Sequence, residues 1–324
     1  MNHSLTEIAE KIKAARNILI ATHAYPDADA LGSQLGLGNA LEGCGKKVFL
    51  YIEEALSYLY DFMPGSEKLQ TVLPDLKDFD CAIALDCGDC FRLGRQLESL
   101  LTIHPFLVID HHTGHKEFGD FRWVDESRAA TGEMIYDLLT EMGVAISYET
   151  AYCLYAAIVS DTGSFKYSST TADTFRVSQE LVARGVQPAK VAGKLFDNFT
   201  VGRLQLLKNV LDTLTLYGDK QIATITVTRN MFAETGASEE DTETFINYPR
   251  SLSSVRIAAF FKEAKDGRIS VSLRSKGKQL DVAMVARHFG GGGHRNASGF
   301  KMAGMDIDQV REQLMQQLLP LVTV

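Results

Sequence analysis

The stretch Phe106-Leu107-Val108-Ile109-Asp110-His111-His112 decides the fold of this 324-residue chain. Four consecutive apolar residues are typical of a short β-strand buried on both faces, and a carboxylate and two imidazoles follow where the strand ends. Polar side chains gathered directly after a buried strand favour a binding site over an ordinary loop. In a parallel sheet, ligands bind at the carboxyl ends of the strands. The stretch therefore predicts a parallel sheet with a functional site at that edge.

Three more apolar runs of similar length lie upstream, at residues 17–22, 47–52 and 81–85. A helix-like stretch, 30–42, stands between the first two and is closed by glycines. Ser4 with Glu7 predicts a capping box for an opening helix, and further helices are expected at 131–142, 149–160 and 170–183. Strand alternating with helix predicts an α/β fold with a parallel, doubly wound sheet.

The pattern changes after a helical stretch that begins near residue 196. Beyond it, three β-rich segments (221–228, 255–262 and 268–274) precede a helix at 281–288, a run of four glycines and a last helix capped by Asp306 and Gln309. A length of 324 residues suggests about two domains. We therefore expect a catalytic domain over 1–195, a helical linker over 196–212 and a second, smaller α/β domain over 213–324.

Composition excludes several classes of protein. The chain is 45% hydrophobic and 23% charged, as ordinary globular proteins are. No apolar run approaches the roughly 20 residues that span a bilayer, and the polar N-terminus does not resemble a signal peptide. Five cysteines, an odd number, suit a reducing compartment, so we expect a cytoplasmic protein without membrane association.

The charge is unevenly distributed. Residues 1–200 carry 17 Lys and Arg against 28 Asp and Glu, a net charge of −11, whereas residues 201–324 carry 16 against 13, a net charge of +3. An acidic chain lacks the basic surface that proteins use to bind long duplexes through many phosphates. A short anionic ligand remains compatible with these charges.

Polar residues also follow the other predicted strands. The first run is followed by His23 and then by Pro26, Asp27 and Asp29, and the third run by Asp86. Carboxylates that converge in a partly desolvated cleft cannot all stay ionised without a cation, so Asp27, Asp29, Asp86, Asp110 and Asp161 together imply a metal. Carboxylates and imidazoles without thiolates favour Mn²⁺, with Mg²⁺, Co²⁺ or Fe²⁺ as alternatives. Such a set can hold two divalent ions that activate water and clamp a phosphoryl group.

Five motifs, in order along the chain, resemble those of the DHH phosphoesterase superfamily with a C-terminal DHHA1 domain. They are His23-x-x-Pro26-Asp27-x-Asp29, Asp86, Asp110-His111-His112, Ser160-Asp161-Thr162 and Gly290-Gly291-Gly292-Gly293-His294. The length and the two-domain layout are similar to those of the nano-RNase branch. Members of that branch degrade very short oligonucleotides and often also dephosphorylate 3′-phosphoadenosine 5′-phosphate (pAp).

The resemblance implies roles for the residues and a place for the site, in the cleft between the domains. His23 and Asp27 would hold one ion, Asp29, His111 and Asp161 the other, and Asp86 would bridge the two. Asp110 would orient an imidazole, and His112 would face the substrate phosphate. Asp86, Asp110 and His112 are thus the expected catalytic residues.

The second domain is expected to bind substrate. Consecutive glycines can bring backbone N–H groups close to an anion, so Gly291, Gly292 and Gly293 predict a phosphate-binding loop to which His294 and Arg295 add donors. Arg274 resembles the substrate-binding arginine of the family. The expected partners are short single-stranded oligonucleotides and pAp, and a homodimer is left open.

Two other functions compete with this interpretation. One is hydrolysis of the linear dinucleotide pApA, formed in cyclic-di-AMP turnover; the other is a nucleotide-binding module without catalysis. The complete ligand set argues against loss of catalysis. Pyrophosphate hydrolysis is disfavoured. Inorganic pyrophosphatases with a DHH motif have a different C-terminal domain, without the glycine run that precedes His294 in this chain.

Overall fold

The structure of the chain is a computed structural model that describes residues 2–277 and 279–322, with only the backbone of His294. The chain forms two compact units, of which the first ends at Asn198 and the second begins at Phe199. Each unit has a six-stranded sheet of its own.

The sheet of the first unit is entirely parallel and has the strand order β3-β2-β1-β4-β5-β6. Its strands are β1 (Asn17–Thr22), β2 (Lys47–Tyr51), β3 (Leu69–Gln70), β4 (Cys81–Leu85), β5 (Phe106–Asp110) and β6 (Phe121–Val124). The predicted parallel, doubly wound sheet is confirmed. The edge strands β3 and β6 were not predicted, because one has two residues and the other contains an arginine.

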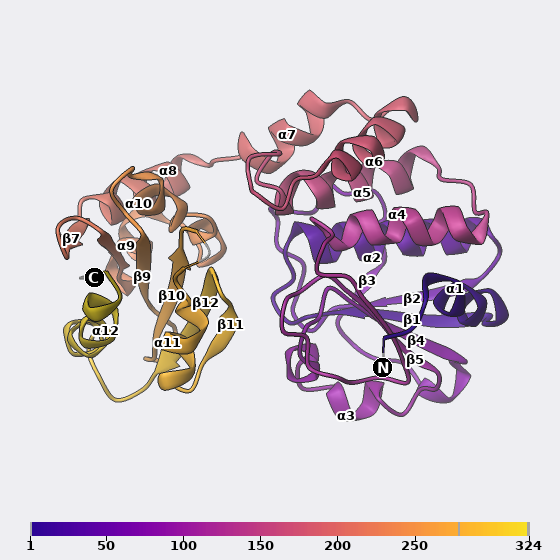
Figure 1. Cartoon of the computed structure of the whole chain (residues 1–324), viewed down its shortest axis with the longest axis horizontal. Helices are drawn as coiled ribbons and strands as arrows, with labels where there is room; N and C mark the ends of the chain where they lie inside the picture. The colour runs from indigo at the N-terminus through magenta and orange to yellow at the C-terminus, as the bar shows by residue number, and fades with distance from the viewer. Residues whose placement is uncertain (1, 278, 323–324) are drawn as a thin grey trace. The chain divides into compact units, whose positions relative to one another are not determined.

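Helices cover both faces of this sheet (Figure 1). Alternate residues of a strand point to opposite faces, so Ile18 and Ile20 of β1 join one core cluster and Leu19 and Ala21 another. The larger cluster lies under α1 (Leu5–Ala14), α2 (Ala28–Gly43), α4 (Thr131–Met142) and α5 (Tyr148–Asp161), with α6 (Ala172–Ala183) and α7 (Pro188–Phe196) packed against α5. The short α3 (Leu97–Leu100) and the 3₁₀ turns Ser66–Lys68, Leu76–Asp78 and Cys90–Leu93 complete the unit.

Helices α2 and α5 pack against each other unusually closely. A Cβ atom at Gly32 would lie 2.5 Å from the carbonyl oxygen of Cys153, and one at Gly36 would lie 2.6 Å from a methyl of Leu154. Glycine in a helix interior costs about 1 kcal/mol relative to alanine, and here it permits the close approach. The contact fixes the first turn of α2 beside the last turn of α5.

The sheet of the second unit is mixed, with the strand order β11-β12-β10-β9-β8-β7. Its strands are β7 (Thr215–Tyr217), β8 (Ile222–Val227), β9 (Ile257–Glu263), β10 (Ile269–Ser275), β11 (Gly292–His294) and β12 (Ala297–Met302). Among the described strand pairs of this second sheet, only β8 and β9 are parallel. The expected smaller α/β domain is confirmed.

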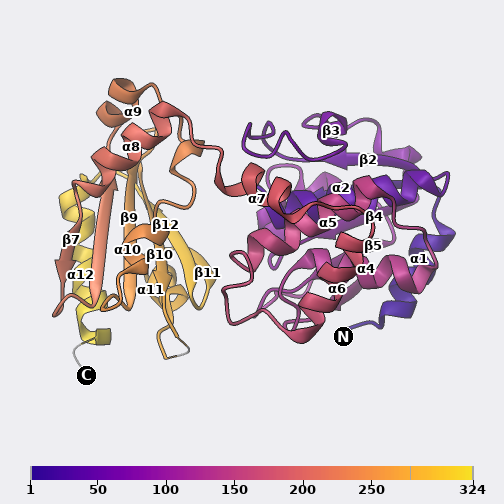
Figure 2. The same ribbon diagram turned by 90° about the horizontal axis from the view of Figure 1, so that it is seen from above.

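The helices of the second unit lie on both faces of its sheet (Figure 2). They are α8 (Val201–Leu211), α9 (Arg229–Thr235), α10 (Asn247–Ser251), α11 (Val282–His288) and α12 (Ile307–Val322), with a 3₁₀ turn at Glu240–Thr242. Side chains of α8 and α9 share a core with one face, and those of α11 and α12 with the other. Both predicted capping boxes are present, at Ser4 with Glu7 and at Asp306 with Gln309.

None of the helices in the described part of the chain is both long enough and apolar enough to cross a membrane.

Candidate metal centre

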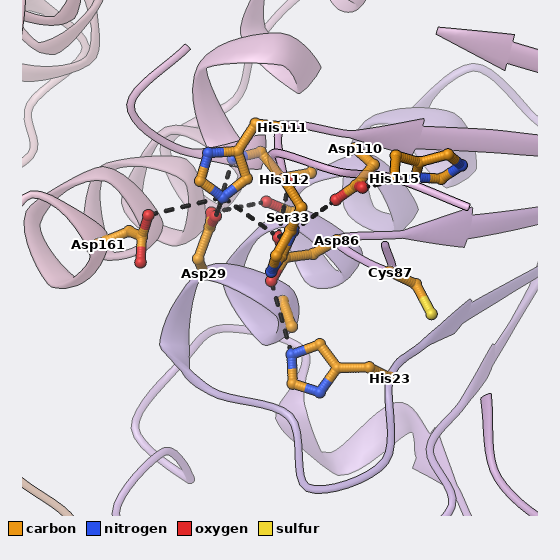
Figure 3. Close-up of polar contacts among 12 residues, drawn as sticks. His23, Asp29, Ser33, Asp86, Cys87, Asp110, His111, His112, His115 and Asp161 are labelled. Atoms are coloured by element: carbon orange, nitrogen blue, oxygen red, sulfur yellow. Dashed lines mark hydrogen bonds and ion pairs between the residues drawn. The ribbon is translucent and has the colours of Figure 1, made fainter. Parts of the chain in front are cut away.

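The predicted polar residues of the first unit converge at the carboxyl edge of the parallel sheet (Figure 3). His23 follows β1, Asp86 follows β4, and Asp110 ends β5, with His111 and His112 directly after it. Two helix ends supply the remaining carboxylates. Asp27 caps the N-terminus of α2, Asp29 lies in its first turn, and Asp161 is the last residue of α5.

Asp29 is buried against the N-terminus of α4. Its carboxylate accepts hydrogen bonds from the backbone N–H of Thr131 at 2.7 Å and of Gly132 at 3.0 Å, and from the hydroxyl of Ser33 at 3.2 Å. A helix N-terminus carries unpaired N–H donors and a partial positive charge, both of which favour a carboxylate. These contacts hold Asp29 in one orientation.

Asp86 is the centre of the cluster. Its side chain is 3% exposed, and its backbone adopts a left-handed conformation with φ of 56° that few residues other than glycine use. Its Oδ1 accepts a hydrogen bond from the Thr131 hydroxyl at 3.0 Å and lies 3.4 Å from His111 Nε2. Its Oδ2 lies 3.6 Å from His23 Nε2. A strained backbone at a buried carboxylate is typical of a functional site.

Backbone carbonyls fix the tautomers of two imidazoles. The carbonyl of Arg128 accepts a hydrogen bond from Nδ1 of His111 at 3.1 Å, and that of Ala24 from Nδ1 of His23 at 2.9 Å. A carbonyl only accepts, so Nδ1 carries the proton in each ring and Nε2 of the neutral ring carries the lone pair. In both residues Nε2 is the atom near the carboxylates, as a metal ligand requires.

Asp110 stands behind these groups and is fully buried. Its Oδ1 lies 2.6 Å from Nδ1 of His112, and its Oδ2 lies 2.7 Å from Nδ1 of His115. Burial alone would oppose ionisation, but the hydrogen bonds from the two histidines outweigh it and lower the pKa of Asp110 well below its ordinary value. Asp110 is therefore a carboxylate that receives a proton donor on each oxygen.

The electrostatics of the cluster call for a cation. Burial and the charges of Asp86 and Asp161 raise the pKa of Asp29. Burial and the charges of Asp27 and Asp86 raise the pKa of Asp161 to about 7. Burial also opposes ionisation of Asp86, but His112, His111 and His23 outweigh it and lower its pKa. Each ionised carboxylate thus opposes ionisation of its neighbours. A divalent cation among them would let all of them ionise.

Three overlapping groups have donor atoms within 4.8 Å of one another, a spacing that fits a bound ion. They are His23 with Asp27 and Asp86, Asp29 with His111 and Asp161, and Asp86 with His111 and His112. Asp86 and His111 each belong to two of the groups, so these two residues link the three groups. The donor set consists of oxygen and imidazole nitrogen, which suits Mn²⁺ and related ions.

Sequence patterns missed several residues that support this centre. Thr131 and Ser33 donate to the carboxylates from helices that show only apolar periodicity, and His115 lies in an irregular loop after β5. Nothing in the spacing of these residues distinguishes them from caps and surface polar groups. Their positions follow from tertiary packing.

The predicted substrate residues of the second unit share one end of its sheet. Arg274 on β10 and His294 on β11 both pair with Ala297 of β12, one from each side. At two positions of the run, packing leaves no space for a side chain. A Cβ atom at Gly291 would lie 2.2 Å from the carbonyl oxygen of Gly299, and one at Gly293 would lie 2.6 Å from that of Ala297. The side chain of His294 lies outside the described part of the chain. Arg295 is exposed in the turn that follows β11.

A parallel sheet that gathers carboxylates and imidazoles at its carboxyl edge is typical of α/β proteins that bind a ligand or a metal at that edge. Two family models match this chain: the DHH family, N-terminal domain, over residues 17–158, and the DHHA1 domain over residues 219–319. The chain belongs to the DHH family, which is metal-dependent, and carries a DHHA1 domain.

Similar proteins agree over almost the whole chain. A bifunctional oligoribonuclease and PAP phosphatase of Thermus thermophilus is 32% identical, over 95% of this chain and 91% of that protein. A protein of the same name from Bacillus subtilis is 27% identical, over 93% and 94%. The crystal structure of an exopolyphosphatase-related protein from Bacteroides fragilis superposes with a TM-score of 0.90 at 28% identity, over 99% and 97%.

A weaker match bears on the competing function. A cyclic-di-AMP phosphodiesterase of Geobacillus thermodenitrificans is 24% identical over 98% of this chain, but the match spans only 49% of that longer protein.

Proposed function

We propose that the chain is a dimetal phosphoesterase that hydrolyses very short oligonucleotides to mononucleotides and pAp to AMP. The observation that carries this proposal is the position of Asp86, which belongs to two of the three groups of potential ligands. Relatives named as oligoribonucleases and PAP phosphatases match more than nine-tenths of the chain, which supports the choice of substrates.

In this proposal each ion has its own ligands. His23 and Asp27 would hold one, Asp29, His111 and Asp161 would hold the other, and Asp86 would be shared by the two. We propose Mn²⁺ as the metal, because the donors are carboxylates and imidazoles. Two such ions supply a water of lowered pKa and neutralise charge that develops on the phosphoryl group.

The remaining residues position the substrate. His112 contacts the scissile phosphate, and Asp110 sets the orientation of its ring through the hydrogen bond to Nδ1. Thr131 and the N-terminus of α4 keep Asp86 and Asp29 in place. These contacts provide groups that are ordered before the substrate binds, which is the main source of rate acceleration in phosphoryl transfer.

The second unit is proposed to hold the terminal phosphate of the substrate. Arg274, His294, Arg295 and the glycines 291–293 supply the donors. An active site in a cleft between the two domains stays a prediction, as do a cytoplasmic location and the exclusion of long duplexes. A homodimer stays open.

The test is a substrate series. We expect RNAs of two to five nucleotides to be hydrolysed with a higher kcat/KM than a 24-mer, and pAp to yield AMP and phosphate. The acidic first half offers few basic groups that could bind a longer strand. A profile that is flat or that rises with length would contradict the proposal and would favour a processive exonuclease.

The same assay distinguishes the proposed function from a second candidate function, hydrolysis of linear pApA. The cyclic-di-AMP phosphodiesterase relative favours linear pApA as an alternative substrate. A kcat/KM for pApA that exceeds those for other dinucleotides and for pAp by more than about tenfold would replace the proposed function with this one. Binding without turnover on every substrate would instead indicate a nucleotide-binding module.

A further inference from the structure

His115 makes a contact that the proposed reaction has not used. It lies in the loop between β5 and β6, and its Nδ1 lies 2.7 Å from Oδ2 of Asp110. The other oxygen of the same carboxylate lies 2.6 Å from Nδ1 of His112. Figure 3 shows Asp110 between the two histidines. One buried carboxylate therefore links a histidine at the metal centre to a histidine outside it.

An aspartate carboxylate needs a second partner to hold one orientation. Rotation about its last torsion angle has a broad, shallow energy profile, so a single hydrogen bond leaves the plane of the group poorly defined. A donor on each oxygen defines that plane. Because Asp110 accepts from His112 on one side and from His115 on the other, His115 determines where Oδ1 meets the ring of His112.

Packing holds His115 in position. Its side chain is 6% exposed and stacks on Phe118, with ring centroids 5.3 Å apart and an angle of 15° between the planes. Phe118 in turn packs against Phe106 of β5, at a centroid distance of 6.3 Å. The backbone N–H of Lys116 donates to the carbonyl of Gly88 at 2.8 Å and ties the loop to the one after β4. These contacts hold the imidazole beside Asp110.

The other nitrogen of the ring indicates why a histidine stands here. Nε2 of His115 is buried and has no hydrogen-bond partner among the described residues. A buried polar atom without a partner is unfavourable. A leucine or phenylalanine would fill the same space without that cost, so packing does not explain the imidazole. Its contribution is the donor at Nδ1.

We propose that His115 is a positioning residue of the reaction: by donating to Asp110 it fixes the carboxylate that sets the tautomer and the orientation of His112. With Nδ1–H of His112 donated to Asp110, the lone pair of the neutral ring lies on Nε2. The consequence for catalysis rests on the proposed function, whereas the consequence for the tautomer of His112 does not.

Three variants test the proposal in the full-length protein. His115→Leu removes the donor at similar size. His115→Asn keeps a donor, because the amide nitrogen of asparagine lies at the same number of bonds from the backbone as Nδ1 of histidine. His104→Leu is the matched control, since it removes a histidine that contacts a carboxylate, Asp120, outside the ligand groups.

We would measure kcat and KM on pAp with Mn²⁺, the metal bound per chain, and the ¹⁵N shifts of His112 in protein loaded with Mg²⁺. For His115→Leu we expect kcat to fall about 10- to 100-fold, the size of effect seen when an outer hydrogen-bond partner at a metal site is removed, while KM and metal content stay unchanged. The ¹⁵N shifts should move from a single tautomer to a mixture. His115→Asn should restore kcat to within a few-fold and should restore the single tautomer. His104→Leu should leave both kcat and the His112 spectrum unchanged.

Two results would overturn the proposal. One is a His115→Leu protein with unchanged kcat and an unchanged His112 spectrum. The other is a His115→Asn protein as impaired as His115→Leu, which would show that the ring and not its donor matters. If the wild-type protein turned over no substrate, the proposed function would fail, and the His112 spectra would still decide whether His115 sets the tautomer.

Discussion

At the scale of single residues, Asp86 determines the charge balance of the site. It lies at the end of a buried strand with a left-handed backbone, and three imidazoles and the Thr131 hydroxyl lie within 3.6 Å of its oxygens. Removal of its charge changes the surroundings of both groups of ligands that contain it. No other carboxylate of the described site belongs to two of these groups.

We therefore predict that Asp86→Asn removes most of the turnover, by about a thousandfold or more, and lowers the bound metal by at least one ion per chain. A bridging ligand that loses its charge weakens both sites at once. Activity on pAp and elemental analysis of the same sample measure the two effects. Asp61→Asn, at an exposed position that belongs to none of the ligand groups, is the control and should match the wild type. A variant at Asp86 that retained full metal and activity would exclude the bridging role.

The sequence predicted much of this site for a simple reason. His23, Asp86, Asp110, His111 and His112 directly follow apolar runs, and the carboxyl ends of parallel strands meet at one edge of the sheet. Asp29 and Asp161 depend on helix ends, which the sequence also marks with caps. Thr131 and His115 could not be predicted, because their roles arise from packing between elements that lie far apart in the chain.

At the scale of elements, the contact between α2 and α5 places the metal centre. Asp29 lies in the first turn of α2 and Asp161 at the end of α5, and Gly32 lets the two helices approach. The N-terminus of α4 meets the same point, since Thr131 and Gly132 donate to Asp29. Three helix ends thus meet above the edge of the sheet.

Gly32→Ala should destabilise the first unit. The added methyl would overlap the Cys153 carbonyl, a contact that backbone movement must relieve, and overpacking of this kind costs about 1–3 kcal/mol. Gly43→Ala, at the exposed end of the same helix, meets nothing within 4 Å and should be neutral or stabilising by up to about 1 kcal/mol. Urea denaturation in the presence of chelator, so that metal binding does not contribute, compares the free energies of unfolding. Equal effects of the two substitutions would show that the close approach does not constrain the fold.

The elements that the sequence missed have weak patterns. The four central strands β1, β2, β4 and β5 are mostly apolar runs, and they were predicted within one or two residues. β11 consists of a histidine and two glycines, and glycine has low strand propensity. The strand forms along the edge of β12, against which Gly293 packs closely. Such strands are determined by their neighbours and not by local preference.

At the scale of the whole molecule, the proposal assigns chemistry to the first unit and substrate capture to the second. Arg274 tests this division, because it lies in the second unit and in none of the ligand groups. A charge-assisted hydrogen bond to phosphate contributes about 1.5–3 kcal/mol. If the two units divide the work in this way, loss of this hydrogen bond should lower kcat/KM only for substrates that have a terminal phosphate.

Arg274→Ala should lower kcat/KM on pAp by about 10- to 150-fold, at 1.4 kcal/mol per decade. Metal content should not change, and activity on bis-para-nitrophenyl phosphate, which has no terminal phosphate to hold, should stay near that of the wild type. Arg268→Ala, at a turn beside the same strand, is the matched control. Equal losses on the two substrates, or loss of metal, would place Arg274 in the catalytic or structural framework.

The central claim is that this chain is a metal-dependent phosphoesterase, and metal removal tests it most directly. We would measure turnover of pAp by protein freed of metal, with its content checked by elemental analysis, and then during titration with Mn²⁺. The account predicts no turnover without metal and full recovery at two ions per chain. Undiminished turnover by the metal-free protein would contradict it.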